Sequence, residues 1–451
     1  MDCGKLRVNA GMSRRDFAKA GAELFFVTAA GRVVGAGAPS NRVRLAIMGC
    51  HEKGRGRSVM NTMMKTPGVE IAWVCDVDSR ARDFATKMVE DATGFRPKKE
   101  KDIRKVLEDA NLDGIVCETP DHWHACAAFM AMNAGKAVYV EKPCCFCPAE
   151  GEKLIAEWKR TGMVFQMGNQ RRASKTYRAA LEWAKDGLPL GEFKYARAWY
   201  DAVRPPNGIG KAVPVPDWLD WDLWQGPAPR TEFHDNYVHY KWHWFRRWGT
   251  AESGNNAPHF LDAARWALGV KFPKRVLSGG GLCFPHPDDE YEWPDTFNMT
   301  FEYPGDKVIV WEGTSHSRLN KYMGYRSAAV VYGSAGSLLF APDDTVTAFT
   351  SEGEVIRKWE ASGKTATGSL TDPTQGIDPM HAAKFVDCVR ARDQRTNSPA
   401  DEAVMSSFMP VVGNIAQLTG ESIRLDPDSG RLLTKAGEPH WAREYEKGWA
   451  F

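Results

Sequence analysis

Residues 43–56 read VRLAIMGCHEKGRG, an apolar run that leads into a glycine-rich turn. The run is apolar throughout instead of alternating, which is typical of a strand buried on both faces of a parallel sheet. Similar runs recur at 69–76, 112–120, 137–143 and 163–169, with helix-forming segments between them. Alternating strands and helices of this kind predict a doubly wound domain, in which ligands bind at the carboxyl ends of the strands.

The first two strand ends carry features of a dinucleotide site. Gly49, Gly54 and Gly56 would let the backbone approach a pyrophosphate at the start of a helix, although His51 stands where a strict GxGxxG motif has glycine. A plain tight turn is the other interpretation. Asp76 ends the second strand, where a carboxylate accepts hydrogen bonds from a ribose and repels a 2′-phosphate. Together the two features favour NAD over NADP.

The third and fourth strand ends are also polar. They read TPDHWH at 119–124 and EKP at 141–143, and CCFC follows at 144–147. CCFC has neither the second CxxC nor the nearby histidine pair of a zinc site, so no metal is expected there. A lysine at the exit of a buried strand is costly without a partner, which makes Lys142 the candidate for chemistry. A lysine that reaches the surface from the strand end is the alternative.

Short motifs extend over nearly the whole chain after residue 42. They are VCDVD at 74–78, TPDHWHA at 119–125, GKAVYVEKP at 135–143, QMGNQRR at 166–172, WDLWQGPAP at 221–229, WHWF at 242–245, HFLDAARWALG at 259–269 and VVGNIA at 411–416. In this order they resemble the oxidoreductase family named for glucose–fructose oxidoreductase and inositol dehydrogenase (Gfo/Idh/MocA). Several separate blocks in the right order make the resemblance specific.

In fold, the resemblance implies an α/β protein with two domains. A doubly wound Rossmann domain at 42–168 would bind NAD, and a C-terminal α+β domain at 169–451 would hold a large, mostly antiparallel open sheet. The residues agree, because an alternating strand at 193–203 is followed by three hairpins between 296 and 360, and two helical segments close the chain. The free face of such a sheet often joins subunits in this family, so a homo-oligomer is expected.

The resemblance also implies a catalytic group around Lys142, which would lie beside the nicotinamide and the reacting carbon. An aspartate and a histidine are its usual partners, and here they correspond to Asn255 and His259. His259 is the expected general base, since an unperturbed imidazole titrates near neutrality. Asp262, one helical turn further, is expected to pair with that ring or to contact substrate. Further cofactor contacts are expected from the strand ends, at Thr119, Pro120, His122, His124 and Glu141.

Substrate contacts are expected at the junction of the two domains. Those that follow the last strand of the first domain are Asn169, Gln170, Arg171 and Arg172. Trp242 and His243 belong to a tryptophan-rich stretch whose aromatic faces suit sugar rings, although at least half of these tryptophans must pack loop to core. His239 and His243 would suit a metal on a helix, but HYKWHWF alternates like a strand and no metal is predicted.

The N-terminal segment, residues 1–41, differs from the rest. Arg14 and Arg15 precede an apolar run and Ala36-Gly37-Ala38, a pattern that indicates a twin-arginine signal and export to the periplasm. An ordinary amphipathic helix on a cytoplasmic protein is the alternative. A net charge of +2 indicates neither a nucleic-acid partner nor a polybasic membrane patch. The sequence contains no run of about 18 uncharged apolar residues, so no membrane span is expected.

The leading functional hypothesis is a nicotinamide-dependent oxidoreductase acting on a secondary hydroxyl of a sugar, polyol or glycoside. A second hypothesis is a glycoside hydrolase or lyase that recycles bound NAD through a keto-sugar. The presence of Lys142 weighs against this hypothesis, because NAD-dependent glycosidases that resemble this family have a different motif in place of EKP at the end of this strand. A third hypothesis is a non-enzymatic sugar or dinucleotide sensor, suggested by Asn255 and the imperfect glycine motif.

Overall fold

The computed structural model describes residues 26–27, 33–34, 42–317, 322–361 and 377–451. The export signal predicted at 1–41 lies outside these residues, apart from β1 (Phe26–Val27) and β2 (Val33–Val34), which pair antiparallel. Among the described residues, no helix has the length and apolar character needed to cross a membrane.

Six parallel strands form the first sheet, as the apolar runs predict. Its order is β5-β4-β3-β6-β7-β8. β4 and β5 therefore lie on one side of β3, and β6, β7 and β8 lie on the other. The strands are β3 (Val43–Met48), β4 (Val69–Cys75), β5 (Lys98–Glu100), β6 (Gly114–Cys117), β7 (Ala137–Val140) and β8 (Phe165–Met167). The connecting helices are α2 (Arg55–Lys65), α3 (Ser79–Thr93), α4 (Ile103–Leu107), α5 (Asp121–Asn133) and α6 (Pro148–Thr161).

Two separate apolar clusters show that both faces of this sheet are covered. One joins the sheet to α2 and α3 through Val59 and Val89, and the other joins it to α5 and α6 through Ala128 and Leu154. Strands enclosed in this way expose no polar face, which explains why their sequences are apolar throughout. The doubly wound prediction is confirmed.

Nine strands form the second sheet, in the order β16-β15-β14-β13-β9-β12-β11-β10-β17. All neighbours are antiparallel except β9 and β12. The strands are β9 (Phe193–Asp201), β10 (Arg275–Gly281), β11 (Thr296–Tyr303), β12 (Lys307–Thr314), β13 (Ser327–Gly333), β14 (Gly336–Phe340), β15 (Val346–Thr350), β16 (Val355–Trp359) and β17 (Ile423–Arg424). The three predicted hairpins are β11–β12, β13–β14 and β15–β16, so this part of the fold prediction is also confirmed.

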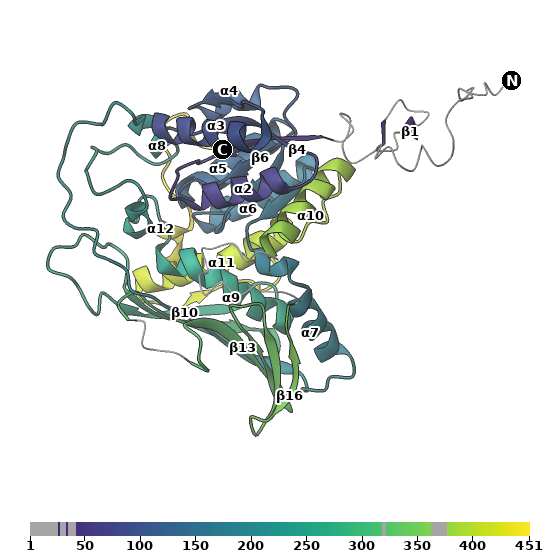
Figure 1. The fold of residues 1–451 in the computed structure, drawn as a ribbon. Helices are drawn as coiled ribbons and strands as arrows, with labels where there is room; N and C mark the ends of the chain where they lie inside the picture. Colours follow the sequence, from purple (N-terminus) through teal and green to yellow (C-terminus); the bar gives the residue numbers. More distant parts are fainter. Residues whose placement is uncertain (1–25, 28–32, 35–41, 318–321, 362–376) are drawn as a thin grey trace, which may run out of the picture.

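Helices fill the space between the two sheets (Figure 1). The long ones are α7 (Lys175–Lys185), α9 (Ala251–Leu268), α10 (Ile377–Ala391) and α11 (Ala400–Thr419). α9 packs on β9, β12 and β13, while α11 contacts both α9 and α6, and α10 contacts α2. The short elements are η2 (Gln170–Ala173), η4 (Pro304–Asp306), η5 (Lys435–Gly437) and α12 (Glu438–Trp441). The end of the chain therefore returns to the first domain and joins it to the second.

Residues 202–250, which we call the strap, connect β9 to α9. The strap contains α8 (Trp221–Gln225) and η3 (Lys241–Trp244), and Figure 1 shows it leaving the large sheet and reaching α3. The strand expected at HYKWHWF is a 3₁₀ turn instead. Trp221, Trp224 and Trp248 pack with Phe233 and Phe245 in an apolar cluster of their own, so the strap has a small core. These three tryptophans therefore pack in a core, as the sequence analysis expected for at least half of the tryptophans in this stretch.

Candidate active site

A cavity of about 670 Å³ lies where the carboxyl ends of the parallel strands face the strap and α9. The first domain, the strap and α9 each contribute a wall. The lining includes Gly49, Gly54, Gly56, Asp76, Glu118, Thr119, Pro120, His124, Glu141, Lys142, Gln170, His239, Trp242, His243, Asn255 and His259. Most residues that the sequence assigned to cofactor, substrate and catalysis are thus brought together.

The turn between β3 and α2 brings the backbone to the cavity. Gly49 has a φ of +89°, in the left-handed region that favours glycine. A Cβ on Gly56 would lie 2.0 Å from the carbonyl oxygen of Gly49, so glycine is required there too. The N-cap residue of α2 is Gly54, which offers no side chain to the first N–H groups of the helix. These groups are open to a phosphate, as the dinucleotide prediction requires.

Asp76 lies on the cavity wall at the end of β4. Its carboxylate accepts hydrogen bonds from the backbone N–H groups of Cys50 (2.6 Å) and Asp78 (2.9 Å), which fix it against the glycine turn. Burial raises the pKa of Asp76. Each carboxylate oxygen retains a second lone pair that can accept a ribose hydroxyl.

The strand end TPDHWH has a larger structural role than the sequence indicated. Both ring nitrogens of His124 contact backbone carbonyl oxygens, those of Pro143 at 2.7 Å and Thr119 at 2.8 Å. His122 is fully buried behind the cavity wall, where its Nε2 contacts the carbonyl oxygen of Trp224 at 3.1 Å. The cofactor contact expected of His122 is therefore corrected, because this ring supports the strap.

Lys142 extends from the end of β7 towards α9. Its Nζ donates to the backbone oxygen of Asn255 at 2.5 Å and to the side-chain oxygen of the same residue at 3.2 Å. Burial lowers the pKa of Lys142. The amide that replaces the expected aspartate is thus a direct partner of the lysine.

Acidic and basic groups missed by the sequence reasoning lie close to Lys142. Arg55 contacts Glu141 at 3.4 Å and forms two hydrogen bonds of 3.0 Å with Asp378 of α10. Both carboxylate oxygens of Glu118 are buried without a hydrogen-bond partner among the described residues. Burial, followed by the negative charge of Glu141, raises the pKa of Glu118 well above its usual range. Glu118 could have been identified from the sequence, because it is an acidic residue at the end of a strand that is otherwise apolar.

His259 lines the cavity from α9, as expected of a catalytic residue, but without the expected acidic partner. Burial, and then the positive charge of Lys142, lowers the pKa of His259 well below its usual range, so the ring is neutral. Asp262 instead accepts hydrogen bonds from Arg172 at 2.8 and 3.0 Å and from Ser406. The predicted pairing of Asp262 with the imidazole is wrong because stronger cationic partners occupy the carboxylate.

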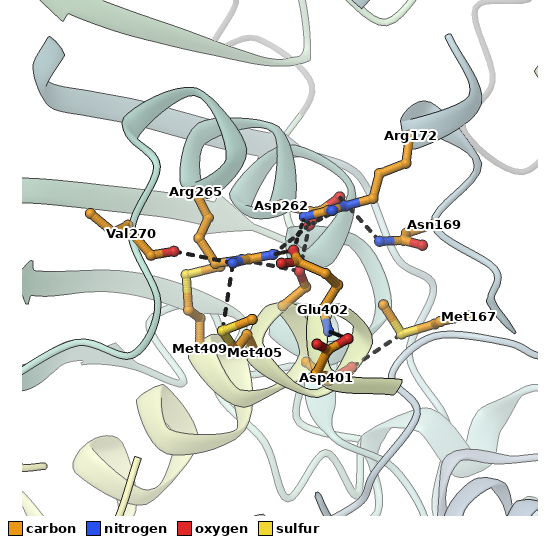
Figure 2. A network of polar contacts seen from close by, with 12 residues as sticks. Met167, Asn169, Arg172, Asp262, Arg265, Val270, Asp401, Glu402, Met405 and Met409 are labelled. Atoms are coloured by element: carbon orange, nitrogen blue, oxygen red, sulfur yellow. Dashed lines mark hydrogen bonds and ion pairs between the residues drawn. The ribbon is translucent and has the colours of Figure 1, made fainter. Parts of the chain in front are cut away.

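Several predicted substrate contacts lie in a buried polar network behind the cavity. Figure 2 shows Asn169, Arg172 and Asp262 joined to Arg265 and Glu402, between η2, α9 and α11. These residues hold η2, α9 and α11 together and are not among those that line the cavity, so their substrate-binding assignment is corrected.

Two further residues of η2 have different environments. Arg171 lies over the ring of Phe260, 4.4 Å from its centre, and donates to the hydroxyl of Tyr177 at 3.1 Å. It too has a structural role, which corrects its assignment as a substrate contact. Gln170 does line the cavity, and its Oε1 is buried without a hydrogen-bond partner in the described part of the chain.

The strap is attached to the first domain beside Asp76. Ser79 donates its backbone N–H to the carbonyl oxygen of Trp218 at 2.9 Å, and Asp220 donates to that of Val77 at 3.1 Å. The guanidinium of Arg80 lies 3.4 Å from the centre of the Trp218 ring. These contacts hold the strap against the end of β4 and the start of α3, beside Asp76.

His239 completes this attachment. Its Nε2 lies 3.0 Å from Oδ2 of Asp78, and its ring stacks on that of His51 with 4.2 Å between centres. One donor atom from each of these three residues lies within 4.8 Å of the others, a spacing that a metal could use. However, Arg80 also donates to both oxygens of Asp78. The rings of His51 and His239 stack on each other, and both oxygens of Asp78 already accept hydrogen bonds. This arrangement is better suited to holding the strap on the first domain than to binding a metal, and we call the contact between His239 and Asp78 the latch.

The electrostatics of Asp78 support this interpretation. Burial alone would raise the pKa of Asp78, but hydrogen bonds from His239 and Arg80 outweigh it and hold the pKa below its usual range. An ionised Asp78 thus holds the strap. His243, the other histidine considered for a metal, has its Nδ1 on the carbonyl oxygen of Tyr240.

Residues 43–169 match the family described as oxidoreductase family, NAD-binding Rossmann fold (Gfo/Idh/MocA). This match covers the first domain of the chain. It is 37% identical over 220 residues to a glycosyl hydrolase family 109 protein of Saccharopolyspora erythraea, covering 48% of this chain and 42% of that one. It is 29% identical over 138 residues to a scyllo-inositol 2-dehydrogenase (NAD(+)) of Bacillus subtilis, covering 30% and 38%. The chain spans less than half the length of either relative.

Solved structures share both domains of this chain. Myo-inositol 2-dehydrogenase from Lactobacillus plantarum superposes with a TM-score of 0.62 at 18% identity, covering 85% of this chain and 100% of that one. Levoglucosan dehydrogenase in complex with NADH and levoglucosan gives 0.62 at 16% identity, covering 85% and 99%. At such identities the likeness shows the fold.

The cavity fits the NAD that the family binds. The glycine turn provides open N–H groups for a pyrophosphate, Asp76 provides ribose acceptors, and Glu118 and Gln170 provide buried oxygen atoms that lack partners among the described residues. NAD would lie along the strand ends, with its adenosine beside Asp76 and its nicotinamide beside Lys142.

Proposed function

We propose that the protein is an NAD-dependent oxidoreductase that oxidises a secondary hydroxyl of a sugar, polyol or glycoside. The observation that carries this proposal is the position of Lys142, whose ammonium group projects into the NAD cavity and is bonded to Asn255. A cation fixed in this way is suited to an oxygen atom that gains negative charge during oxidation.

The reaction needs an acceptor for the hydroxyl proton, an electrostatic partner for the oxygen and a hydride acceptor. NAD, when bound, supplies the last of these. Lys142 donates to the substrate oxygen and stabilises its alkoxide character. His259 and His243 both line the cavity as neutral rings, and either can accept a proton. Asn255 orients the lysine through its two oxygen atoms.

The substrate side of the cavity favours a neutral, hydroxyl-rich molecule. Arg204 reaches this wall, but Glu252 neutralises it through hydrogen bonds of 2.8 and 2.9 Å. Trp242 lines the cavity and offers an aromatic face for C–H groups of a sugar ring. The buried Oε1 of Gln170 can accept a hydrogen bond from a hydroxyl. The inositol and levoglucosan dehydrogenases named above act on molecules of this class.

A glycoside hydrolase or lyase that recycles NAD is the second candidate. The attachment of the strap beside Asp76 favours it, because a covered cofactor would exchange slowly and would have to be reoxidised in place. The relative named as a glycosyl hydrolase family 109 protein supports the same reading. In this case a keto-sugar would lose its aglycone before the hydride returns.

One experiment separates these functions. Purified protein is offered myo-inositol, scyllo-inositol, levoglucosan and 4-nitrophenyl glycosides, and both NADH absorbance and released nitrophenol are followed. A dehydrogenase accumulates NADH with an equal amount of keto product, whereas a redox-assisted hydrolase releases nitrophenol without net NADH. Binding of these compounds without either product would instead identify a sensor.

We also propose a location and an oligomeric state for the protein. The arginine pair Arg14–Arg15 supports a twin-arginine signal and a periplasmic location. Changing both to lysine should leave the protein in the cytoplasm, and unchanged fractionation would disprove the signal. We further propose a homo-oligomer assembled through the nine-stranded sheet, which light scattering of the purified protein can test.

A further inference from the structure

Glu118 directly follows β6 and lies on the cavity wall between the glycine turn and Lys142. A Cβ on Gly56, in the first turn of α2, would lie 3.2 Å from the Cβ of Glu118. On its other side the carboxyl group of Glu118 faces the side chains of Glu141 and Lys142. Glu118 is therefore placed between the open N–H groups of α2, which suit a diphosphate, and the end of the cavity that suits a nicotinamide.

The carboxyl group of Glu118 belongs to a cluster of five charged groups in which acids are in excess. Glu141 and Asp378 are the other carboxyl groups. Arg55 and Lys142 are the cations. Arg55 donates to Glu141 at 3.4 Å and to Asp378 at 3.0 Å. The backbone N–H of Lys142 donates to Glu141 at 3.3 Å. With every group ionised, three negative and two positive charges would leave a net charge of −1.

Glu118 is the member of this cluster that is best suited to hold a proton. Both of its oxygen atoms are buried without a hydrogen-bond partner among the described residues, whereas Glu141 and Asp378 each accept hydrogen bonds. A carboxylate buried without donors costs far more free energy than a neutral carboxylic acid. A proton on Glu118 also cancels the excess charge of the cluster. The raised pKa of Glu118, caused by burial and then by the charge of Glu141, agrees with this assignment.

Protonated Glu118 has an O–H group that lines the cavity and lacks an acceptor in the described part of the chain. We propose that Glu118 is a neutral carboxylic acid that donates this O–H to an oxygen atom of bound NAD, on the diphosphate or on the ribose that carries the nicotinamide. A carboxylate at the same place would repel the diphosphate, so NAD binding requires the proton. The inference concerns the cofactor alone and holds whichever substrate the protein oxidises.

NAD binding should therefore depend on pH, with a definite sign. Below the pKa of Glu118 the free protein already has the proton, and NAD binds without further uptake. Above that pKa the free protein must take up one proton to bind NAD, so the Kd should rise by up to about tenfold per pH unit. The titratable groups that face Glu118 are Arg55, Glu141, Lys142 and Asp378, with Tyr139, Cys50 and Cys117 beside them.

The first test counts the protons that accompany nucleotide binding. Calorimetric titrations in buffers of different ionisation enthalpy should show that NAD and ADP-ribose take up more protons at pH 9 than at pH 6. The uptake should be absent in Glu118→Gln but present in Asp76→Asn and in the control Glu352→Gln, because Glu352 is exposed. Uptake with ADP would identify the diphosphate as the acceptor, and uptake with ADP-ribose but not ADP would identify the ribose. AMP has neither group, so equal uptake with AMP would contradict the proposal.

Infrared difference spectroscopy detects the proton directly, including the case in which Glu118 stays protonated at every pH tested. Protein at pH 7 should show the C=O stretch of a neutral carboxylic acid that is absent in Glu118→Gln. Binding of ADP-ribose should shift this band, because the O–H then has an acceptor. A wild-type spectrum without the band would overturn the assignment.

Two substitutions separate a cofactor contact from a structural role. Glu118→Gln retains a neutral N–H donor and should bind NAD within about threefold of wild type at pH 7. Glu118→Met has a similar size but no donor, so its NAD affinity should fall about tenfold or more. Its Tm without nucleotide should not fall, because a buried polar group without a partner has been removed. A purely structural role would lower both quantities.

The result for this inference is separable from that for the proposed function. All of these measurements use nucleotide without substrate. If Glu118→Met binds NAD as wild type does, the hydrogen bond is disproved and the oxidoreductase proposal is unaffected. If the wild type binds NAD with proton uptake but oxidises nothing in the panel, the oxidoreductase proposal fails and the role of Glu118 stands.

Discussion

Two of the three walls of the NAD cavity are built in different ways. The wall from the first domain consists of strand ends, where the sheet fixes the position of each side chain and a short motif marks each strand. The opposite wall is the strap, whose residues 202–250 contain one short helix and one 3₁₀ turn. The first wall resembles that of any dinucleotide-binding protein, whereas the strap supplies groups particular to this chain.

The comparison indicates where function is determined. Asp76, Lys142 and the glycine turn belong to the strand-end wall, where they would bind the cofactor and stabilise charge. His239 and His243 belong to the strap, where His239 would hold the strap on the first domain and His243 adds a neutral ring to the cavity. Variants on the two walls should therefore differ in what they change, which gives four predictions.

The largest effect is expected on the strand-end wall, at Lys142. Lys142→Met should lower kcat by about 10² to 10³, because one preorganised donor to the reacting oxygen is lost. NAD affinity, measured by quenching of tryptophan fluorescence, should stay within about twofold. Lys136→Met is a matched control, since Lys136 is also buried but donates to the backbone oxygens of Asp109 and Leu112 and does not line the cavity. Retention of full turnover by Lys142→Met would remove the lysine from the mechanism.

Asp76 should give the next effect, on the choice between NAD and NADP. Wild-type protein should bind NAD at least about tenfold tighter than NADP, or roughly 1.4 kcal/mol, and Asp76→Asn should reduce that ratio towards one. Because burial raises the pKa of Asp76, its carboxylate loses its charge at a higher pH than a free aspartate does, so discrimination should weaken as the pH is lowered. Calorimetric titration with both nucleotides provides the measurement. A ratio independent of pH and of the substitution would show that Asp76 does not read the ribose.

The site was less predictable than the fold, for a physical reason. The pattern of apolar strands and hairpins depends on local spacing, so both sheets could be predicted. Lys142, Asp76 and the glycines could be found because strand ends of a parallel sheet converge. The pairing of Asp262 with Arg172 instead of His259 could not, since it depends on contacts between η2 and α9.

The strap is a clearer example of contacts that could not be predicted from the sequence. Nothing in the local sequence of His239 indicates that it meets Asp78, which is 161 positions away. The stretch HYKWHWF alternates as a strand does, yet it forms a 3₁₀ turn because the aromatic cluster of the strap decides its conformation. Tertiary packing overrides a short periodic pattern of this kind.

A smaller effect is expected on the strap wall, at its latch. His239→Ala removes the bond to Asp78 and should increase the rate of NAD dissociation by about fivefold, the equivalent of one hydrogen bond of about 1 kcal/mol. Stopped-flow displacement of NADH by excess NAD measures this rate. His286→Ala is the control, because His286 is exposed and does not line the cavity. If both variants release NADH at the wild-type rate, the strap does not retain the cofactor.

The smallest effect is expected from Glu118, the buried acid of the strand-end wall. Its pKa is raised well above 4.5, so the folded protein holds this proton more tightly than the unfolded chain does. The linked stability is present below about pH 4.5 and is lost as the pH rises towards the folded-state pKa, because the unfolded carboxyl ionises first. Glu118→Gln keeps the shape of the side chain but cannot ionise. In protein free of nucleotide it should therefore raise the Tm at pH 8 by roughly 1–4 °C, and by less at pH 5.

Calorimetry of both proteins at the two pH values measures the difference, and Glu352→Gln is the control because Glu352 is exposed. An equal shift at both pH values would mean that Glu118 is already ionised in the folded protein and has a partner that the geometry does not reveal.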